Sequence, residues 1–372
     1  MEWFEWAAWG AAIIWWTILL LPWQPWRIRE VLEPDGGGDV SAQLSQLTVL
    51  IPARNEADVI GTSLQSLAQQ APGLKVIVVD DQSEDGTAKA ACRVDGLDLT
   101  IIQGKSLSGE WSGKLWALEQ GLQRVTTPKL LLLDADIQLR PGMVAALLAK
   151  MEQQQLDFVS IMAHLRMESW WEKLLMPAFI YFFKLLYPFS LANNPALTRF
   201  AAAAGGCILL KTEALHAIGG FAALKNALID DCTLAQRIKR QGYRTWIGLS
   251  RGVVSQRRYE SLAPVWQMVA RTAFTQLRYS AALLALCTLL MITAFWVPLA
   301  ALVVESTAMT GLAALGAMMA SYWPTLRYYQ LPFGWSLAMP AIGTIYLLMT
   351  WDSALKYWQG ERSRWKGRVY VN

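Results

Sequence analysis

The chain has 372 residues, of which 54% are hydrophobic and 17% are charged, whereas an average soluble chain has about 45–50% and about 25%. The formal net charge is only +4, so the composition indicates neither intrinsic disorder nor a surface for nucleic acid. The 19 tryptophans fit a membrane protein, because indole rings settle at membrane–water boundaries. We therefore expect an integral membrane protein with a soluble part.

The first segment predicts a retained membrane anchor. Residues 6–26 carry no charge, and about 20 apolar residues suffice to cross a bilayer. Two glutamates precede this run and Arg27 and Arg29 follow it, so the positive-inside rule places the next residues in the cytoplasm. No basic n-region or A-x-A site indicates a removable signal peptide. We assign residues 1–28 to the anchor and residues 29–45, with their P-D-G-G-G stretch, to a linker.

Strand and helix signals alternate over residues 46–278, which we expect to form a cytoplasmic α/β domain. Short apolar runs predict strands, and helical spacing predicts the segments between them: strands at 47–51, 76–79 and 130–133, helices at 58–69, 113–124 and 141–154. This order predicts a mostly parallel sheet with right-handed crossovers. Ligands of such sheets bind outside the carboxyl ends of the strands, and polar clusters follow each run.

Polar residues at the ends of the first two predicted strands indicate a nucleotide site. Asp80 and Asp81 end the second strand in V-V-D-D-Q-S-E-D-G-T, and a carboxylate there can accept from a base N–H or a ribose hydroxyl. P-A-R-N-E (52–56) ends the first strand and can flank the same base. The chain has no G-x-G-x-x-G after this strand and no P-loop, so hydride transfer and P-loop hydrolysis lose their main support.

Three further clusters can act on a diphosphate and an acceptor. Asp134 and Asp136, if the backbone is extended, lie on one side and can share a divalent cation with phosphates. Lys114 in G-E-W-S-G-K (109–114) lies near a predicted helix start, where free N–H groups favour a diphosphate. Asp230 and Asp231 precede a helical stretch; one can cap it, and a buried one would suit a general base. The structural alternatives are a solvated acidic turn, an exposed lysine and a simple cap.

These motifs, taken in order, resemble the inverting family 2 glycosyltransferases of the GT-A fold over about residues 46–275. G-E-W-S-G-K-L-W-A is similar to the G-W-x-G-K-x-W-A element of membrane glycosyltransferases of the ceramide glucosyltransferase type. With the anchor, V-A-R-T-A-F-T-Q-L-R-Y-S (269–280) and W-K-G-R-V-Y in the tail, the chain most resembles the hopanoid-biosynthesis-associated glycosyltransferase group. The resemblance implies an α/β, Rossmann-like GT-A domain with transmembrane helices at both ends.

The resemblance implies transfer of a hexose from a UDP-sugar to a membrane lipid hydroxyl, with Mg²⁺ or Mn²⁺. It also implies a role for each matching residue: Asp80 and Asp81 at the uridine; Pro52, Ala53, Arg54 and Glu56 around the base; Lys114 at the diphosphate; Asp136 with Asp134 at the metal; Asp231 as general base oriented by Asp230; and Gly205, Gly206 and Cys207 on the acceptor side.

The Q-x-x-R-W motif of the family has no intact copy in this chain. Gln256–Tyr259 reads Q-R-R-Y and lies early, whereas Gln267–Arg271 occupies the expected position with one extra residue and without the tryptophan. Of the two, we prefer Arg271 as the diphosphate partner. Processive polysaccharide synthases use the tryptophan to hold a growing chain, so its loss favours non-processive transfer.

The C-terminal part predicts transmembrane helices over 279–352 and a basic tail over 353–372. Three uncharged runs, 279–304, 306–326 and 328–351, are each long enough to cross. Three crossings would leave the tail outside, whereas its basic residues favour a cytoplasmic tail, so the number of crossings stays open. Residues 168–190 predict an interfacial helix that docks the domain on the membrane, with a buried core helix as the alternative.

Two other functions remain open at this stage. A polyprenyl-phosphate sugar transferase of the same fold would use a phosphate acceptor, which needs little base catalysis. A membrane scaffold that retains an inactive nucleotide fold is the second alternative. For the hexosyltransferase and for the polyprenyl-phosphate sugar transferase alike, we expect an integral protein of a bacterial plasma membrane, with no nucleic-acid partner.

Overall fold

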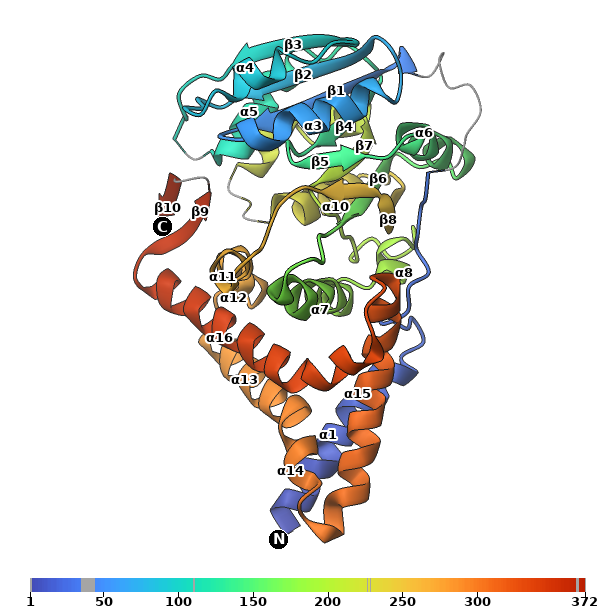
Figure 1. Cartoon of the computed structure of the whole chain (residues 1–372), viewed down its shortest axis with the longest axis vertical. Helices are drawn as coiled ribbons and strands as arrows, with labels where there is room; N and C mark the ends of the chain where they lie inside the picture. Colours follow the sequence, from blue (N-terminus) through green and yellow to red (C-terminus); the bar gives the residue numbers. More distant parts are fainter. Residues whose placement is uncertain are drawn as a thin grey trace.

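The computed structural model describes residues 2–34, 44–109, 111–225, 227, 229–365 and 368–371, and the side chains of these residues up to 360. Most of the predicted linker, Glu110 of G-E-W-S-G-K and the side chains of the basic tail from residue 361 onward lie outside this description. A domain built on a β-sheet lies at one end of the long axis of the molecule, and helices from both ends of the chain project at the other (Figure 1).

An eight-stranded sheet forms the centre of this sheet domain, with the strand order β3-β2-β1-β4-β7-β6-β8-β5. The strands are β1 Leu47–Ala53, β2 Leu74–Asp80, β3 Leu97–Gln103, β4 Lys129–Leu133, β5 Ile137–Leu139, β6 Phe158–His164, β7 Cys207–Lys211 and β8 Thr245–Ser255. Strands β3, β2, β1 and β4 are parallel, whereas β7 is antiparallel to both of its neighbours. The predicted α/β class and the three predicted strands are confirmed.

Helices cover both faces of the sheet. They are α3 Ala57–Ala68, α4 Thr87–Ala91, α5 Gly113–Leu122, α6 Met143–Gln153, α8 Phe189–Ala192, α9 Thr212–Ala217, η1 Phe221–Leu224 and α10 Asp230–Arg240. Strand β1 shows why two cores form: Val49 and Ile51 pack with α3 and α6, while Leu50 packs with α5 and α10. Successive side chains of a strand point to opposite faces, so an apolar run buries both.

The remaining helices form the projecting part and a helical layer beneath the sheet domain (Figure 1). They are α1 Glu2–Leu20, α7 Trp170–Leu186, α11 Leu262–Ala270, α12 Ala273–Gln276, α13 Ala281–Phe295, α14 Val297–Ala301, η2 Glu305–Thr307, α15 Ala308–Tyr328, η3 Phe333–Ala338 and α16 Met339–Trp358, with a hairpin of β9 Glu361–Trp365 and β10 Arg368–Val371 after them. The helical layer contains α7, α11 and α12 (Figure 1). Within the described residues, three helices are long and apolar enough to cross a membrane: 2–20, 281–301 and 333–358.

Two expectations for these helices need correction. The last apolar run does not start its helix at residue 328, because Gln330 has a positive φ of 58° and Pro332 follows it; α16 therefore begins only at Met339. The predicted interfacial helix, α7, is instead largely buried: Leu175, Ile180 and Tyr181 have no exposed surface, and the helix lies in one apolar cluster with parts of α1, α15 and α16. The core-helix alternative describes it better.

Candidate active site

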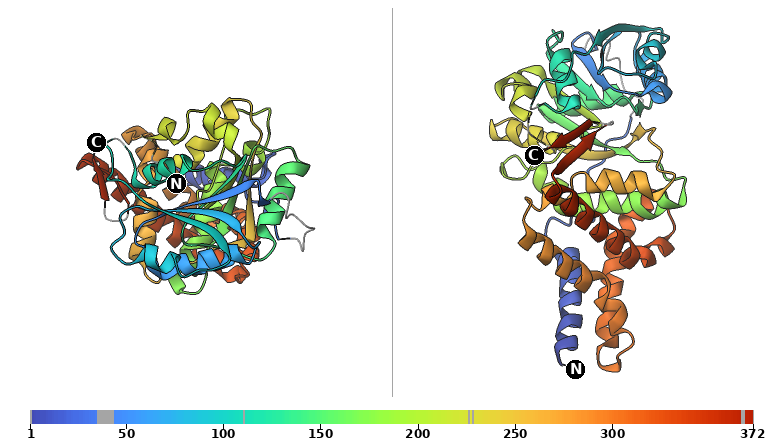
Figure 2. Two further views of the ribbon diagram at one scale, coloured as in Figure 1. Left: turned by 90° about the horizontal axis from the view of Figure 1, so that it is seen from above. Right: turned by 90° about the vertical axis from the view of Figure 1, so that its left-hand side faces the viewer.

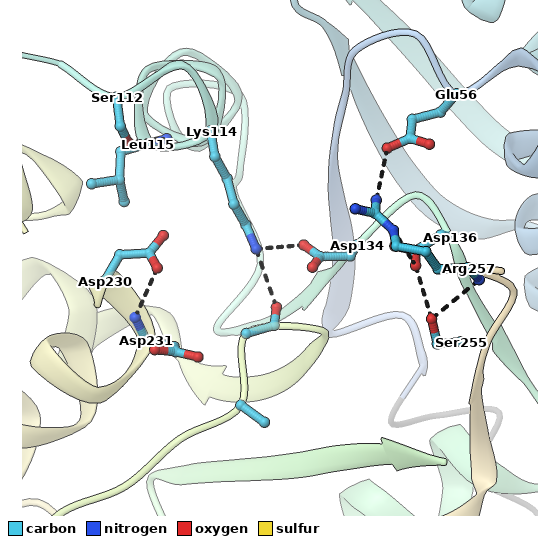
Figure 3. Close-up of polar contacts among 12 residues, drawn as sticks. Glu56, Ser112, Lys114, Leu115, Asp134, Asp136, Asp230, Asp231, Ser255 and Arg257 are labelled. Atoms are coloured by element: carbon cyan, nitrogen blue, oxygen red, sulfur yellow. Dashed lines mark hydrogen bonds and ion pairs between the residues drawn. The ribbon is translucent and has the colours of Figure 1, made fainter. Parts of the chain in front are cut away.

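A half-buried ion pair between α5 and the end of β4 forms the centre of the site (Figure 3). Ser112 caps α5, because its hydroxyl accepts from the Leu115 N–H at 3.4 Å. Lys114 therefore lies in the first turn, and its Nζ is 2.5 Å from Asp134 Oδ1 and 3.5 Å from the Gly205 carbonyl oxygen. Burial alone would lower the pKa of Lys114, but the nearby carboxylates outweigh it and raise the pKa.

Two adjacent carboxylates occupy the first turn of α10, beside this pair. Asp230 Oδ1 accepts from the Asp231 N–H at 3.1 Å, and Asp231 Oδ1 accepts from the Cys232 N–H at 2.7 Å. Burial, together with repulsion from Asp230, raises the pKa of Asp231 to about 6. The N-cap position of α10 is Ile229 and no side chain caps the helix, so neither aspartate is the simple cap, and a pKa near 6 falls in the range of a general base.

Lys114, Asp134 and Asp231 meet around a small cavity of about 20 Å³, which is lined also by Gly205 and Asp230. This volume holds about one water molecule. A Cβ on Gly205 would lie 3.3 Å from Lys114 Nζ and 3.4 Å from Asp231 Oδ2, so glycine keeps this space open.

The other two residues predicted on the acceptor side do not line this cavity. Gly206 packs against Ile137. Cys207 pairs with Leu133 inside the sheet and is fully buried.

The two aspartates of D-A-D point to different neighbours, which corrects the prediction that they lie on one side. Strand β4 ends at Leu133, and a turn follows, closed by the Ile137 N–H donating to the Asp134 carbonyl at 3.0 Å. Because this backbone is not extended, Asp134 reaches Lys114, whereas Asp136 Oδ2 accepts from the Ser255 hydroxyl at 2.9 Å.

Arg257, and not the preferred Arg271, is the arginine that contacts the carboxylates of the candidate site. Its Nε lies 3.5 Å from Asp136 Oδ2, and its Nη2 lies 3.4 Å from Glu56 Oε1. Arg271, the preferred residue, lies exposed at the end of α11, and within the described residues its side chain has no hydrogen bond or ion pair. The sequence signal for Arg257 is Q-R-R-Y (256–259), which lies earlier in the chain than the motif of the family would. Arg257 and Asp136 line a pocket of about 970 Å³ that also reaches His164 and Arg166.

The predicted base-binding residues meet at the ends of β1 and β2. The Asp81 N–H donates to the Ala53 carbonyl at 2.8 Å, and Arg54 Nη1 donates to the Asp81 carbonyl at 2.6 Å. Asp80 Oδ1 accepts from the Ser83 N–H at 3.0 Å, which fixes the following turn. Asp81 is fully buried and lines neither of the two pockets, whereas Pro52 lines the small cavity.

The carboxylates suit a hard cation that is completed by substrate. In the part of the chain that the structure describes, no group of three or more His, Cys, Asp or Glu side chains is arranged to hold a metal. Mg²⁺, however, is commonly held by one or two carboxylates together with substrate phosphates and water. Asp136, with Asp134 nearby, provides this donor set, so the residues present fit such an ion.

Comparisons with known proteins agree with this fold. Residues 48–219 match the family model described as Glycosyl transferase family 2. The 4,4'-diaponeurosporenoate glycosyltransferases of several Staphylococcus aureus strains are 37% identical over 91 residues, which is 24% of this chain and 24% of theirs. The chain thus matches about a quarter of the length of these curated relatives.

Two solved structures extend the comparison. The mannosyltransferase PcManGT from Pyrobaculum calidifontis, in complex with GDP-Man and Mn²⁺, superposes with a TM-score of 0.56 at 20% identity, over 96% of this chain and 100% of that one. Glucosyl-3-phosphoglycerate synthase from Mycobacterium tuberculosis gives 0.44 at 17% identity, over 67% and 86%. The first likeness shows a shared fold, which is GT-A. The family 2 match, residues 48–219, lies within the sheet domain that shares this fold.

Proposed function

We propose that the protein is an inverting, non-processive glycosyltransferase that moves a hexose from a UDP-sugar to the hydroxyl of a membrane lipid, and that it belongs with the hopanoid-associated group. One observation carries this proposal: a carboxylate with a raised pKa, Asp231, lies across Gly205 from the half-buried ion pair of Lys114 and Asp134. This arrangement combines a base for the acceptor with a cation for the leaving group.

On the donor side, the residues would neutralise the diphosphate. Asp136, with Asp134, would hold Mg²⁺ or Mn²⁺, whose positive charge stabilises the departing UDP when the ion is bound. Lys114 and Arg257 would add two cationic groups on either side of D-A-D. Such preorganised charges are commonly the largest contribution to catalysis. Asp81, Arg54 and the end of β1 would bind the uridine.

On the acceptor side, Asp231 would take the proton of the lipid hydroxyl. The oxygen then bonds to the anomeric carbon from the face opposite the diphosphate, the bond from that carbon to the phosphate oxygen breaks, and UDP leaves. Attack from the opposite face inverts the configuration. General-base catalysis of this kind contributes about 10²–10⁴-fold, and Asp230 would keep the pKa of Asp231 high enough for it.

A lipid acceptor and a membrane location have separate support. Three described helices can cross a bilayer, and the charges around the first favour a cytoplasmic sheet domain. The relatives in S. aureus are named for a lipid-like substrate, 4,4'-diaponeurosporenoate.

The test is transfer of radiolabel from UDP-sugars, and from GDP-sugars in parallel, to lipid extracts. Asp231→Asn should lose at least a hundredfold in rate, while the exposed Asp98→Asn on β3 should match the wild type. Equal rates for both variants would show that Asp231 is not the base. If Asp231→Asn stays active with polyprenyl phosphate and neutral lipids are inert, the phosphate-acceptor alternative holds.

A further inference from the structure

The last helix, α16, is attached at both of its ends to the side of the molecule that carries the sheet domain. Before α16 begins, the Tyr328 carbonyl accepts from Arg251 Nη2 of β8 at 2.7 Å, and the Trp335 ring lies 6.1 Å from the ring of Trp170 at the start of α7. Near its end, Asp352 Oδ2 accepts from Trp266 Nε1 of α11 at 2.8 Å.

Two further hydrogen bonds attach α16 to the same layer. The Tyr346 hydroxyl donates to the Leu175 carbonyl of α7 at 2.8 Å, and the Ser353 hydroxyl accepts from the Phe274 N–H of α12 at 3.1 Å. A helix of 20 residues is about 30 Å long, which equals the thickness of the hydrocarbon core. If α16 crossed the bilayer, its ends would lie on opposite sides, whereas here both ends contact the layer under the sheet domain.

The views of the whole chain agree with these contacts. Helices α1 and α15 run along the long axis and project away from the sheet domain, whereas α16 slants across beneath it (Figures 1 and 2). The N-terminus lies at the far tip and the C-terminus lies beside the sheet domain. At the far tip, the Ser306 hydroxyl before α15 donates to Glu5 Oε1 of α1 at 2.9 Å.

One face of α16 is apolar and exposed, and it points away from the layer that holds the helix. Ile342, Tyr346 and Met349 are buried on the inner face. The exposed face carries large apolar side chains at helical spacing: Leu348, Trp351, Leu355 and Trp358. On α13, which packs beside it, Leu286, Leu289 and Leu290 are exposed as well. An apolar surface of this extent, with tryptophans, is typical of contact with lipid.

We propose that α16 lies along the plane of the leaflet on the sheet-domain side and does not cross the bilayer. The chain then crosses three times, through α1, through α13 with α14, and through α15, and its tail returns to the side of the sheet domain. This inference rests on the membrane location within the proposed function. It removes the conflict between three apolar C-terminal runs and a basic tail, because only two of the runs cross.

By length and mean hydropathy, residues 333–358 qualify as a membrane span and α15 does not. The packing of α15 explains its lower hydropathy. In α15, Ser321 and Thr325 are buried against neighbouring helices and not exposed to lipid; Ser321 is 2.7 Å from the Tyr181 hydroxyl of α7. These residues lower the hydropathy of α15 without a cost in lipid. With 21 residues, α15 is about 31 Å long and can cross.

The test is the side from which single cysteines are labelled by an impermeant maleimide, in right-side-out and inverted membrane vesicles. The full chain with Cys92→Ser and Cys287→Ser provides the background, since Cys207 and Cys232 are buried. Gln330→Cys and Gln359→Cys place exposed thiols before and after α16. The wild-type Cys92, exposed on the sheet domain, reports that side, and Trp3→Cys reports the far tip.

We expect Gln330→Cys, Gln359→Cys and Cys92 to be labelled at least tenfold faster in one vesicle orientation, and Trp3→Cys in the other. Labelling of Gln330→Cys and Gln359→Cys from opposite sides would overturn the proposal. A fluorescent-protein or alkaline phosphatase fusion after Asn372 gives a second measurement on the unsubstituted chain, and phosphatase activity would contradict the proposal. Both readouts are independent of sugar transfer, so they can fail or succeed without the proposed activity.

Discussion

The pH dependence of transfer tests the proposed general base most directly. The pKa of Asp231 is raised to about 6, first by burial and then by repulsion from Asp230. At pH 5 about a tenth of this group is then deprotonated, whereas a carboxyl with the ordinary value of 3.8 would be more than nine-tenths deprotonated. We therefore expect kcat/KM to be about tenfold lower at pH 5 than at pH 7.5.

A neighbouring substitution moves this acid limb in a known direction. Asp230→Asn removes the like charge, so the pKa of Asp231 should fall and the limb should shift to lower pH. It should not reach 3.8, because burial is the larger cause of the shift. Initial rates between pH 4.5 and 8 at low donor concentration, for both proteins, measure this. An acid limb near 4 in the wild type, or no shift in the variant, would refute the reasoning.

The same pKa makes a prediction about stability that separates loss of the base from misfolding. A carboxyl whose folded pKa lies above its unfolded value stabilises the fold below the unfolded pKa, and this contribution disappears as the pH rises through about 6. At one pKa unit per about 1.4 kcal/mol, the ionised Asp231 costs up to about 3 kcal/mol at pH 7.5. Asp231→Asn should therefore be inactive and yet melt at higher temperature than the wild type at pH 7.5, but not at pH 4.

Three further predictions concern the rest of the site. Gly205→Ala should slow transfer at least tenfold, because the new methyl enters the space between Lys114 and Asp231. The control is Gly61→Ala, whose new Cβ would have no atom within 4 Å and which should leave the rate unchanged. Equal rates for the two variants would contradict this prediction. Arg257→Met should cost about 10²–10³-fold and Arg271→Met less than threefold, and the reverse ranking would restore Arg271. Calorimetry should show UDP binding that EDTA abolishes and Mn²⁺ restores, and metal-independent binding would contradict a role for Asp136.

The sequence was sufficient for those parts of the fold that local periodicity determines. Strands β1, β2 and β4 and helices α3, α5 and α6 are apolar runs or amphipathic segments that follow each other along the chain, and each formed close to its predicted bounds. The sequence analysis predicts none of the strands β3, β5, β6, β7 and β8. Strand β7 takes its place only by antiparallel pairing with β4, far away in sequence, and such pairing leaves little local signal.

In the candidate site, too, the features that depend on local sequence were predicted and those that depend on distant strand pairing were not. Lys114 was predicted near a helix start, and Ser112 caps that helix locally. The divergence of Asp134 and Asp136 was not predictable, because it depends on a turn that leads into β5, whose partner β8 lies more than a hundred residues later. Arg257 reaches Asp136 because of the same pairing: Ile137, next to Asp136, lies opposite Ser255, which is two residues before Arg257.

The position of Arg257 also depends on the helical layer under the sheet domain. The segment after β8 is held by the capping box of α7: the Tyr259 N–H donates to Glu172 Oε1 at 2.8 Å, and the Ser169 hydroxyl donates to the Tyr259 carbonyl at 3.0 Å. Glu172 accepts from two further backbone N–H groups at the helix start, which lowers its pKa despite burial. Since α7 is in turn bonded to α16, hydrogen bonds and the short backbone segments between them connect the proposed lipid-facing helix to Arg257, whose Nε lies 3.5 Å from Asp136 Oδ2.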